Sequence, residues 1–296
     1  MNDLMQYLQA LIQRGGPQPD DYADLDQWIS QFYIALDAGE LPTDALDHVR
    51  RIIGDILSPR TMHGFAYTKP HGYAGDFEII ERHYLTHIAP EPHLAAWDHY
   101  WHAGAAARAV RNRKDYFHDL LRQHIEAAGG RRVSVLNVAS GPARDVFEFL
   151  SSGTHDVHFE CLDQDPKAIA HASNLCYGFS DQVTFVQADV LRFRPRQSYD
   201  LIWAAGLFDY FSDRVFKLAL RRLLPGVAPD GQLVIGNFSV ANPNIHWLRF
   251  CDWLLHHRNH DQLISLAAEA GAHPERIRIG HEPAGVNLFL HITPNK

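Results

Sequence analysis

Apolar residues recur along the first 130 residues at the three- and four-residue spacing of amphipathic helices. The pattern predicts helices over Leu4–Ile12, Tyr22–Leu36, Asp44–Leu57 and about His93–Ala128. Glycine and proline clusters separate the first three, and Gly129-Gly130 ends the last. Before that last helix lies the stretch KPHGYAGDFEIIERHY, a loop of small and aromatic residues that continues into a further helix.

After Gly130 short apolar runs alternate with helical stretches. Strands are expected over Val133–Val138, Val157–Leu162, Val183–Gln187, Leu201–Ala204, Gln232–Asn237 and Asn287–Thr293. Helices are expected over Ala143–Leu150, Pro166–Leu175, Asp213–Leu224 and Asp261–Ala270. The turn-rich link Gly280–Gly285 fits a terminal hairpin. This alternation indicates an α/β domain with a mostly parallel sheet covered on both faces, behind a helical cap that ends near residue 130.

Composition excludes several classes of protein. Of 296 residues, 46% are apolar and 21% are charged, as in ordinary globular proteins. The net charge of −8 and the short Lys/Arg runs argue against a nucleic-acid partner. No apolar run is long enough to span a membrane, and the N-terminus does not resemble a signal peptide. Three widely spaced cysteines suggest reduced thiols, so we expect a cytoplasmic protein.

The chain holds 20 histidines, and a metal site therefore has to be considered. His83/His87 and His256/His260 are spaced to share a helix face. Neither pair has a third possible ligand at a spacing typical of metal sites, and no H-E-x-x-H motif is present. We expect no metal, and histidines that are solvated or hydrogen-bonded instead.

The segment VSVLNVASGPARDVFEFL, residues 133–150, predicts a strand, a tight turn and a helix. A dinucleotide turn requires glycines in the order G-x-G-x-x-G, and Arg144 stands where the third would be. The shorter spacing G-x-G-x-G places the small residues Ala139, Gly141 and Ala143. That spacing suits a cofactor that lies over the turn and offers no phosphate to bind. Taken alone, the turn also fits an ordinary strand-to-helix connection.

Acidic residues end the next two expected strands. Asp163 lies 22 residues beyond Gly141, where a carboxylate can accept both hydroxyls of a ribose. Asp165 suits the N-cap of the helix that begins at Pro166. Asp189 can accept the exocyclic amine of an adenine, or can simply stabilise a turn. The end of the fourth strand, residues 204–210, is expected across the turn from Gly141.

These segments, in this order, resemble the class I S-adenosylmethionine-dependent methyltransferases over about residues 133–293; LLPGVAPDGQLVIGNF resembles their link into strand five. The resemblance implies a Rossmann-like, seven-stranded, mostly parallel sheet in an S-adenosylmethionine-binding domain over 131–296, with 1–130 as cap and substrate region. The implied cofactor-binding residues are Tyr73, Asp76, Asn137, Ala139, Gly141, Asp163, Gln164, Asp189, Val190 and Ala205. The chain departs from the family at Asn137, where an acid is usual, and at Ala139 and Ala143, where glycines are usual.

Two further segments narrow the resemblance. The GYAGD loop and NFSVANPNIHWLRFCDWLLHHR, residues 237–258, resemble the bacterial methyltransferases of 3-hydroxypalmitic acid methyl ester biosynthesis. This implies a small-molecule acceptor methylated on oxygen, a fatty-acid-like carboxylate or a hydroxyl. A carboxylate is ionised at neutral pH and needs no general base. Tyr73, Asn237 and His246 are the candidates to orient it.

Structural interpretations of the same segments stay open. Trp247, Phe250, Trp253 and Leu254 can line an apolar pocket, or can form a helix stripe that packs on neighbouring elements. Tyr73–Asp76 can close the cofactor site, or can be a turn in which Asp76 caps the following helix.

Two other functions remain compatible with the sequence. One is N-methylation, or another natural-product methylation, with His71 or His246 as base, which would give a pH-rate limb near the pKa of histidine. The other is a non-catalytic sensor or scaffold that binds the cofactor, suggested by Ala139 and Ala143. If the protein is an enzyme, the expected partner is a small molecule, such as a fatty acid or a natural-product intermediate. The sequence does not determine the oligomeric state.

Overall fold

The computed structural model describes residues 2–294, which fall into two compact units. The helical unit comprises the chain up to Arg108 together with an insert, Pro243–Leu254. The sheet unit comprises Ala109–Asn242 together with the chain from Leu255 onward. The division therefore falls inside a helix and not at Gly129-Gly130, because the later part of that helix packs its apolar side chains on the sheet. The roles expected for residues 1–130 and 131–296 remain predictions.

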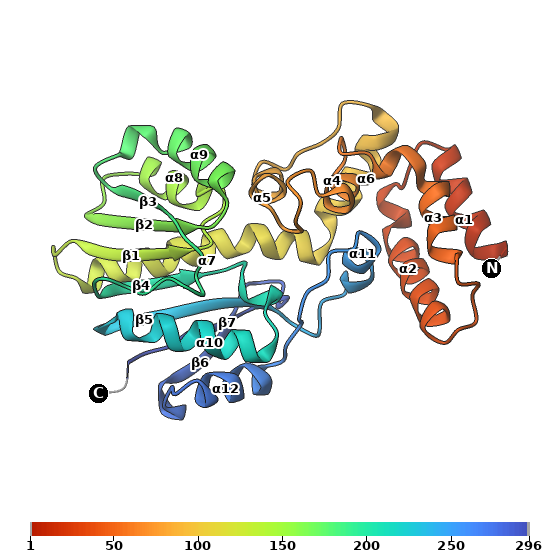
Figure 1. The fold of residues 1–296 in the computed structure, drawn as a ribbon. Coiled ribbons are helices and arrows are strands. Elements are labelled where there is room, and N and C mark those ends of the chain that lie inside the picture. Colours follow the sequence, from red (N-terminus) through yellow and green to blue (C-terminus); the bar gives the residue numbers. More distant parts are fainter. Residues whose placement is uncertain (1, 295–296) are drawn as a thin grey trace. The chain divides into compact units, whose positions relative to one another are not determined.

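The helical unit contains helices at the expected positions and one helix, Met62–Thr68, that was not expected. It contains α1 Asn2–Gln13, α2 Tyr22–Asp37, α3 Ala45–Ile53, α4 Met62–Thr68, α5 Phe77–Tyr84, α6 Pro92–Ala103 and, in the insert, α11 Ile245–Phe250, with 3₁₀ turns at Pro19–Asp21 and Gly54–Leu57 (Figure 1). The expected helix 44–57 is broken at Gly54, whose φ of 56° lies in the left-handed region. The expected helix 93–128 is broken at Gly104, where the backbone is extended.

Aromatic rings form the centre of the helical unit. His63 is almost fully buried, and the rings of Trp97, Tyr100, Trp101 and Trp247 surround it at centroid distances of 4.7–6.1 Å. Burial lowers the pKa of His63 to about 3. This imidazole is therefore neutral at physiological pH and serves as a packed core side chain.

The sheet unit confirms the expected Rossmann-like α/β fold, with seven strands in the order β3-β2-β1-β4-β5-β7-β6. The strands are β1 Val133–Val138, β2 Val157–Asp163, β3 Val183–Gln187, β4 Tyr199–Ala204, β5 Val227–Phe238, β6 Ile277–His281 and β7 Asn287–Ile292. The first five are parallel, and β7 runs antiparallel to both of its neighbours. The helices are α7 Ala105–Ala127, α8 Arg144–Ser151, α9 Pro166–Leu175, α10 Asp213–Leu223 and α12 His260–Glu269; 3₁₀ turns lie at Tyr177–Phe179, Phe208–Tyr210, Leu224–Gly226 and Pro274–Arg276.

Two strands differ from the sequence expectation. β6 was not expected as a strand, yet it pairs with β7 in the terminal hairpin that the turn-rich link suggested. β5 begins at Val227, five residues before the expected strand, and includes Pro229-Asp230-Gly231, part of the segment that resembles the family's link into strand five. An irregularity in the pairing with β4 absorbs these residues.

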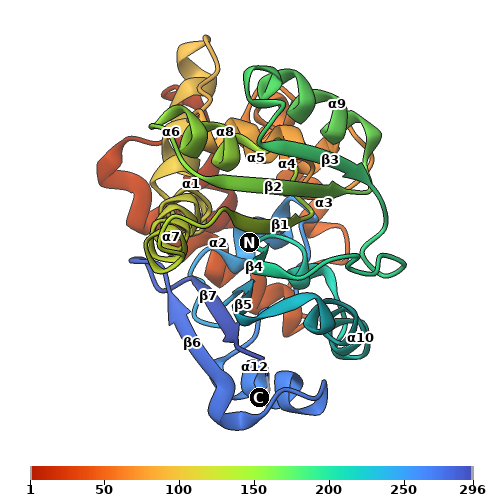
Figure 2. The ribbon, with the colours of Figure 1, turned by 90° about the vertical axis from the view of Figure 1, so that its left-hand side faces the viewer.

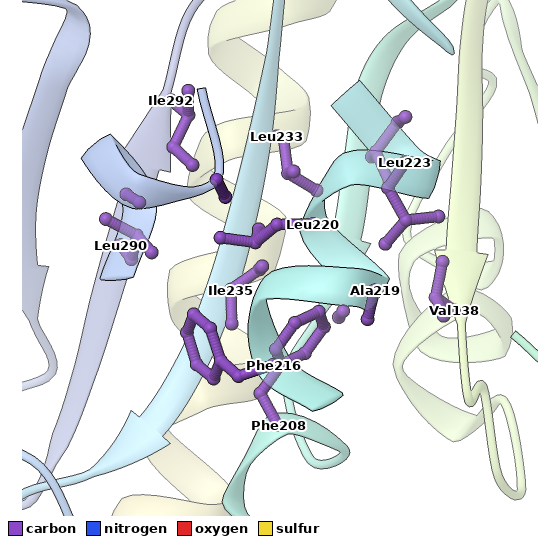
Figure 3. Close-up of a cluster of buried hydrophobic side chains, with 14 of the residues drawn as sticks. Val138, Phe208, Phe216, Ala219, Leu220, Leu223, Leu233, Ile235, Leu290 and Ile292 are labelled. Atoms are coloured by element: carbon purple, nitrogen blue, oxygen red, sulfur yellow. The ribbon is translucent and has the colours of Figure 1, made fainter. Parts of the chain in front are cut away.

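Each face of the sheet carries its own apolar core. Val135, Phe159 and Trp203 pack with Phe117 of α7 and Phe149 of α8 on one face. The alternate residues of the strands, such as Leu136, Ile202 and Leu233, pack with α10 and α12 on the other face (Figures 2 and 3). Because successive strand residues point to opposite faces, a sheet covered on both sides requires continuous apolar runs, which is what the strands show.

No helix within residues 2–294 is long and apolar enough to cross a membrane. Cys161, Cys176 and Cys251 are free thiols, and all three are buried.

Candidate functional site

The candidate site lies at the carboxyl edge of the sheet, between β1 and β4. These strands are neighbours, but the chain continues from β1 toward β2 on one side and from β4 toward β5 on the other. Their following loops therefore diverge, and ligands of open parallel sheets usually bind at such a point. The predicted turn 139–143 follows β1, and the expected segment 204–210 follows β4.

The turn after β1 has three left-handed residues. The φ angles of Ala139, Gly141 and Ala143 are 52°, 54° and 51°. They are the three small positions identified in the sequence. A non-glycine residue in this region costs about 1–2 kcal/mol. The two alanines therefore keep the backbone path of a glycine turn at an energetic cost, and only Gly141 adopts it without a Cβ penalty.

Asp163 holds this turn in place. Its Oδ2 accepts a hydrogen bond from the Gly141 amide at 2.9 Å, and its Oδ1 accepts one from the Asp165 amide at 2.9 Å. Burial raises the pKa of the Asp163 carboxyl, and the backbone donors oppose that rise. The carboxylate predicted from a spacing of 22 residues thus lies directly beside the turn. Its contact with a ribose remains a prediction.

The other residues expected at this edge are placed more loosely. Asp165 caps α9 by accepting from the Lys167 amide at 2.8 Å, as expected. Asp189 accepts a hydrogen bond from the Leu191 amide at 2.8 Å. The carboxylate therefore stabilises a turn, as one of its two interpretations predicted. The Val190 side chain belongs to the core under α10, and any contact with a cofactor would have to use its backbone. Gln164 is exposed, and Ala205 is half-buried.

Sequence reasoning missed three charged residues that the sheet unit buries. Arg113 of α7, Asp145 of α8 and Asp209 in the turn after β4 are each at most 8% exposed. Burial raises the pKa of both carboxyls, that of Asp209 to about 6, and the Arg113 charge partly opposes each rise. A signal for Arg113 was available: it lies four and seven residues before Phe117 and Leu120, on the apolar face of its helix.

Asn237 is committed to structure within the sheet unit. Its side chain is fully buried; Nδ2 donates to the His256 carbonyl at 2.9 Å, and Oδ1 accepts from Arg258 at 2.8 Å. Asp209 accepts from the Phe238 amide next to it at 2.6 Å. These bonds favour a structural role for Asn237 over the orientation of an acceptor, which stays a prediction.

The remaining predicted residues belong to the helical unit. Tyr73 is 38% exposed, whereas Asp76 is buried and caps α5 by accepting from the Glu78 and Ile79 amides at 2.9 Å. His246 stacks on Tyr33 at 5.3 Å, and burial lowers the pKa of its imidazole. The capping interpretation of Asp76 is thus observed. A role for these side chains at the cofactor or acceptor remains a prediction.

The aromatic stripe of the insert also matches its structural interpretation. Trp247, Phe250 and Trp253 are at most 6% exposed and pack within the helical unit, whereas Leu254 is 68% exposed. Among the described residues, no group of three or more His, Cys, Asp or Glu side chains could hold a metal ion.

Comparison with known proteins supports the methyltransferase interpretation. Residues 135–231 match the family model of a methyltransferase domain. This match, together with the fold, supports a class I S-adenosylmethionine-dependent methyltransferase, and S-adenosylmethionine is the cofactor of that family. No curated protein sequence matches the chain.

Solved structures share the fold at low sequence identity. A possible exported protein from Bordetella parapertussis is 22% identical, with a TM-score of 0.60 over 74% of this chain and 80% of its own. The pyocyanin biosynthetic protein PhzM is 16% identical, with a TM-score of 0.51 over 74% and 62%. Magnesium protoporphyrin IX methyltransferase from Synechocystis PCC 6803 is 10% identical, with a TM-score of 0.50 over 64% and 87%.

Because the turn is left-handed, replacing one of its alanines with glycine should increase the stability of the protein. Ala139→Gly should raise the free energy of unfolding by up to about 1 kcal/mol, because the penalty of a left-handed alanine disappears. Gly141→Ala should lower it by about 1–2 kcal/mol. A Cβ at position 141 would meet no atom within 4 Å, so this cost is purely conformational. Chemical denaturation measures both free energies, and a destabilised Ala139→Gly protein would show that the left-handed alanine carries no penalty.

Asp163 and Asp165 should separate binding from stability. Asp163→Ala should weaken S-adenosylmethionine binding by on the order of 2 kcal/mol or more, because the ribose would lose a charged acceptor and the turn would lose its anchor. Asp165→Ala removes only a helix cap and should cost about 1 kcal/mol of stability with affinity nearly unchanged. Calorimetry and denaturation test the pair. Unchanged affinity in a folded Asp163→Ala protein would remove this residue from the site.

Proposed function

We propose that this protein is an S-adenosylmethionine-dependent methyltransferase that methylates an oxygen of a small molecule, a fatty-acid-like carboxylate or a hydroxyl. The observation that carries the cofactor part is the left-handed turn 139–143 with Asp163 bonded to Gly141, inside the segment that matches the methyltransferase domain model. S-adenosylmethionine, when bound, supplies a methyl group on a positively charged sulfur.

The residues at the sheet edge fit this cofactor. The turn offers backbone without bulky side chains, and Gly141 in particular leaves open space where a Cβ would stand. Asp163 is already oriented by two backbone amides, so binding requires no further ordering of its side chain. Preorganisation of this kind strengthens binding because less conformational freedom is lost. Asp163 would hold the ribose, and Asp189 would accept from the adenine amine.

The oxygen acceptor rests on the resemblance of the GYAGD loop and of residues 237–258 to the 3-hydroxypalmitic acid methyl ester group. Methyl transfer to a carboxylate needs alignment and removal of water more than proton transfer. Tyr73 and His246 are the candidates to orient the acceptor. His246 has its pKa lowered by burial, so its neutral ring is also able to act as a base if the acceptor is an amine or a hydroxyl.

An acceptor panel tests this function. The protein would be incubated with S-adenosylmethionine and 3-hydroxy fatty acids below their micelle concentrations, hydroxylated aromatics and amines, with product detected by mass spectrometry between pH 5.5 and 8.5. A carboxylate acceptor should give a methyl ester and a rate with no limb near the pKa of histidine, whereas a hydroxyl acceptor should give a methyl ether. An N-methyl product would overturn the oxygen acceptor. Tight cofactor binding without turnover across the panel would favour the non-catalytic alternative.

The GYAGD loop gives a second test. Tyr73→Phe should lower the rate constant by roughly tenfold to a hundredfold if the hydroxyl bonds the acceptor or cofactor in the transition state, with cofactor affinity changing less. Gly75→Val should be harsher, because Gly75 has a φ of 69° that a branched side chain cannot adopt without strain. Tyr177→Phe, at a residue 84% exposed in the sheet unit, is the matched control and should be silent. Wild-type turnover in both loop variants would leave the loop a purely structural role.

A further inference from the structure

A small open pocket lies on the sheet unit, where the loop after β3 meets the end of α10. Its volume is about 360 Å³, within the range of pockets that take small ligands. Three of its lining residues are positively charged and none is negatively charged; the lining comprises Arg194, Pro195, Leu218, Arg221, Arg222 and Pro225. The pocket therefore attracts anions, although the net charge of the whole chain is −8.

The walls of this pocket are held in place by the fold. Pro195 packs directly on Gly226, because a Cβ on Gly226 would stand 2.5 Å from both Cβ and Cγ of Pro195. Phe193, next to Arg194 in the chain, and Leu224, next to Pro225, pack against the apolar core under α10. The pocket is thus formed before a ligand binds, which limits the conformational freedom lost on binding.

The three arginines are not neutralised by carboxylates. Within residues 2–294 none of them forms an ion pair; Arg221 donates to the backbone carbonyl of Glu269 at 2.7 Å, and Arg222 Nε is buried without a hydrogen-bond partner. The negative end of the α10 dipole favours cations in the last turn of the helix, but it amounts to only about half a charge. It does not account for Arg194, which comes from the loop after β3. An excess of positive charge therefore remains at the pocket.

Apolar surface stands beside these charges. Leu218 lies on the outer side of α10 and is 41% exposed, whereas Phe216, Ala219 and Leu220 on the inner side are fully buried. The rings of the two lining prolines add to this apolar wall. Three guanidiniums offer more donors than one carboxylate can accept, whereas a phosphate group has three acceptor oxygens and up to about two negative charges. The pocket therefore suits a phosphate that is attached to an apolar group.

We propose that this pocket binds a phosphate group with an apolar substituent, held by Arg194, Arg221 and Arg222 around the phosphate and by Leu218 against the apolar part. Two sources supply this chemistry: a soluble phosphate ester, or the headgroup of an anionic phospholipid.

This pocket is separate from the candidate cofactor site. Pro225 directly precedes the turn into β5, so the pocket stands at the amino-terminal end of that strand. The turn 139–143 and Asp163 lie at the carboxyl ends of β1 and β2, which run parallel to the same sheet direction. The proposal therefore goes beyond the proposed function and does not depend on it.

Calorimetry with phenyl phosphate and inorganic phosphate tests the soluble source. Phenyl phosphate should bind more tightly than inorganic phosphate, because its ring adds apolar contact. Arg194→Gln and Arg222→Gln should each weaken phenyl phosphate by about fivefold to twentyfold. Added salt should weaken it as well, since the arginines are partly open to solvent. Leu218→Gln should weaken phenyl phosphate and leave inorganic phosphate nearly unchanged.

Flotation with vesicles tests the membrane source. The vesicles would consist of phosphatidylcholine, with and without phosphatidylglycerol. If the phosphate belongs to a lipid, the wild-type protein should float only with vesicles that contain phosphatidylglycerol, and the double variant Arg194→Gln/Arg222→Gln should not float. Binding of phenyl phosphate without flotation identifies the soluble source instead. Either result supports the pocket.

Two variants separate a built pocket from general positive charge. Gly226→Ala keeps every arginine but forces Pro195 to move, so it should weaken phenyl phosphate or flotation, with near-ultraviolet circular dichroism to check that the variant is folded. Arg122→Gln removes the same charge from α7, on the other face of the sheet, where Arg122 is 56% exposed. It is the matched control and should change neither readout.

Several outcomes would overturn the proposal. Equal weakening in Arg122→Gln and Arg194→Gln would show attraction to overall charge and not to a site. Unchanged binding in both pocket arginine variants, or in a folded Gly226→Ala protein, would also refute it. If Gly226→Ala does not fold, Leu218→Gln decides the same point, because unchanged phenyl phosphate binding and flotation there would remove the apolar wall from the site. A wild-type protein that binds neither phenyl phosphate nor vesicles would refute the pocket outright.

Discussion

The hydrogen bond from the Gly141 amide to Asp163 is the contact on which the candidate site depends. It joins the loop after β1 to the end of β2, and the second oxygen of the same carboxylate holds the amide of Asp165. Asp165 in turn caps α9. One buried acid thus fixes the turn, the strand end and the start of the next helix. Because the carboxylate has lost most of its water, each amide that it accepts stabilises its charged form and the local backbone together.

The turn shows how a departure from a family pattern can keep the same geometry. Ala139 and Ala143 take the left-handed conformation that glycine would take, and Gly141 between them does the same. Ala143 is fully buried at the start of α8, so its methyl group gains packing that offsets part of the strain. Ala139 is only half-buried and gains less. The backbone thus keeps the left-handed conformation at the two positions where the family usually has glycine and this chain has alanine.

The buried residues Arg258 and Asp209 join the segment after β4 to the end of β5. Arg258 donates to the amide oxygen of Asn237 and pairs with Asp213, and its own amide bonds the Phe238 carbonyl. Asp209 accepts from the Phe238 amide. These contacts fix the two segments of the sheet unit from which the insert 243–254 leaves and to which it returns. Removing Asn237 would leave the buried Arg258 with fewer partners in a low-dielectric environment, whereas Asp213 is 69% exposed and stays hydrated.

The sequence by itself determined most of the sheet, the position of the β1 turn and the two acids at the end of β2, because these features depend on local spacing. Alternating apolar runs located the strands, and the 22 residues between Gly141 and Asp163 placed the acid beside the turn. Only the tertiary structure decided which polar residues are used up in the fold. Asn237 was predicted to orient an acceptor, which stays a prediction, and the fold adds that its oxygen accepts a hydrogen bond from Arg258, 21 residues away. Arg113 was not among the expected site residues, and packing of α7 on the sheet buries its guanidinium beside Gly206. Both facts come from contacts between residues distant in the chain, which spacing along one element does not encode.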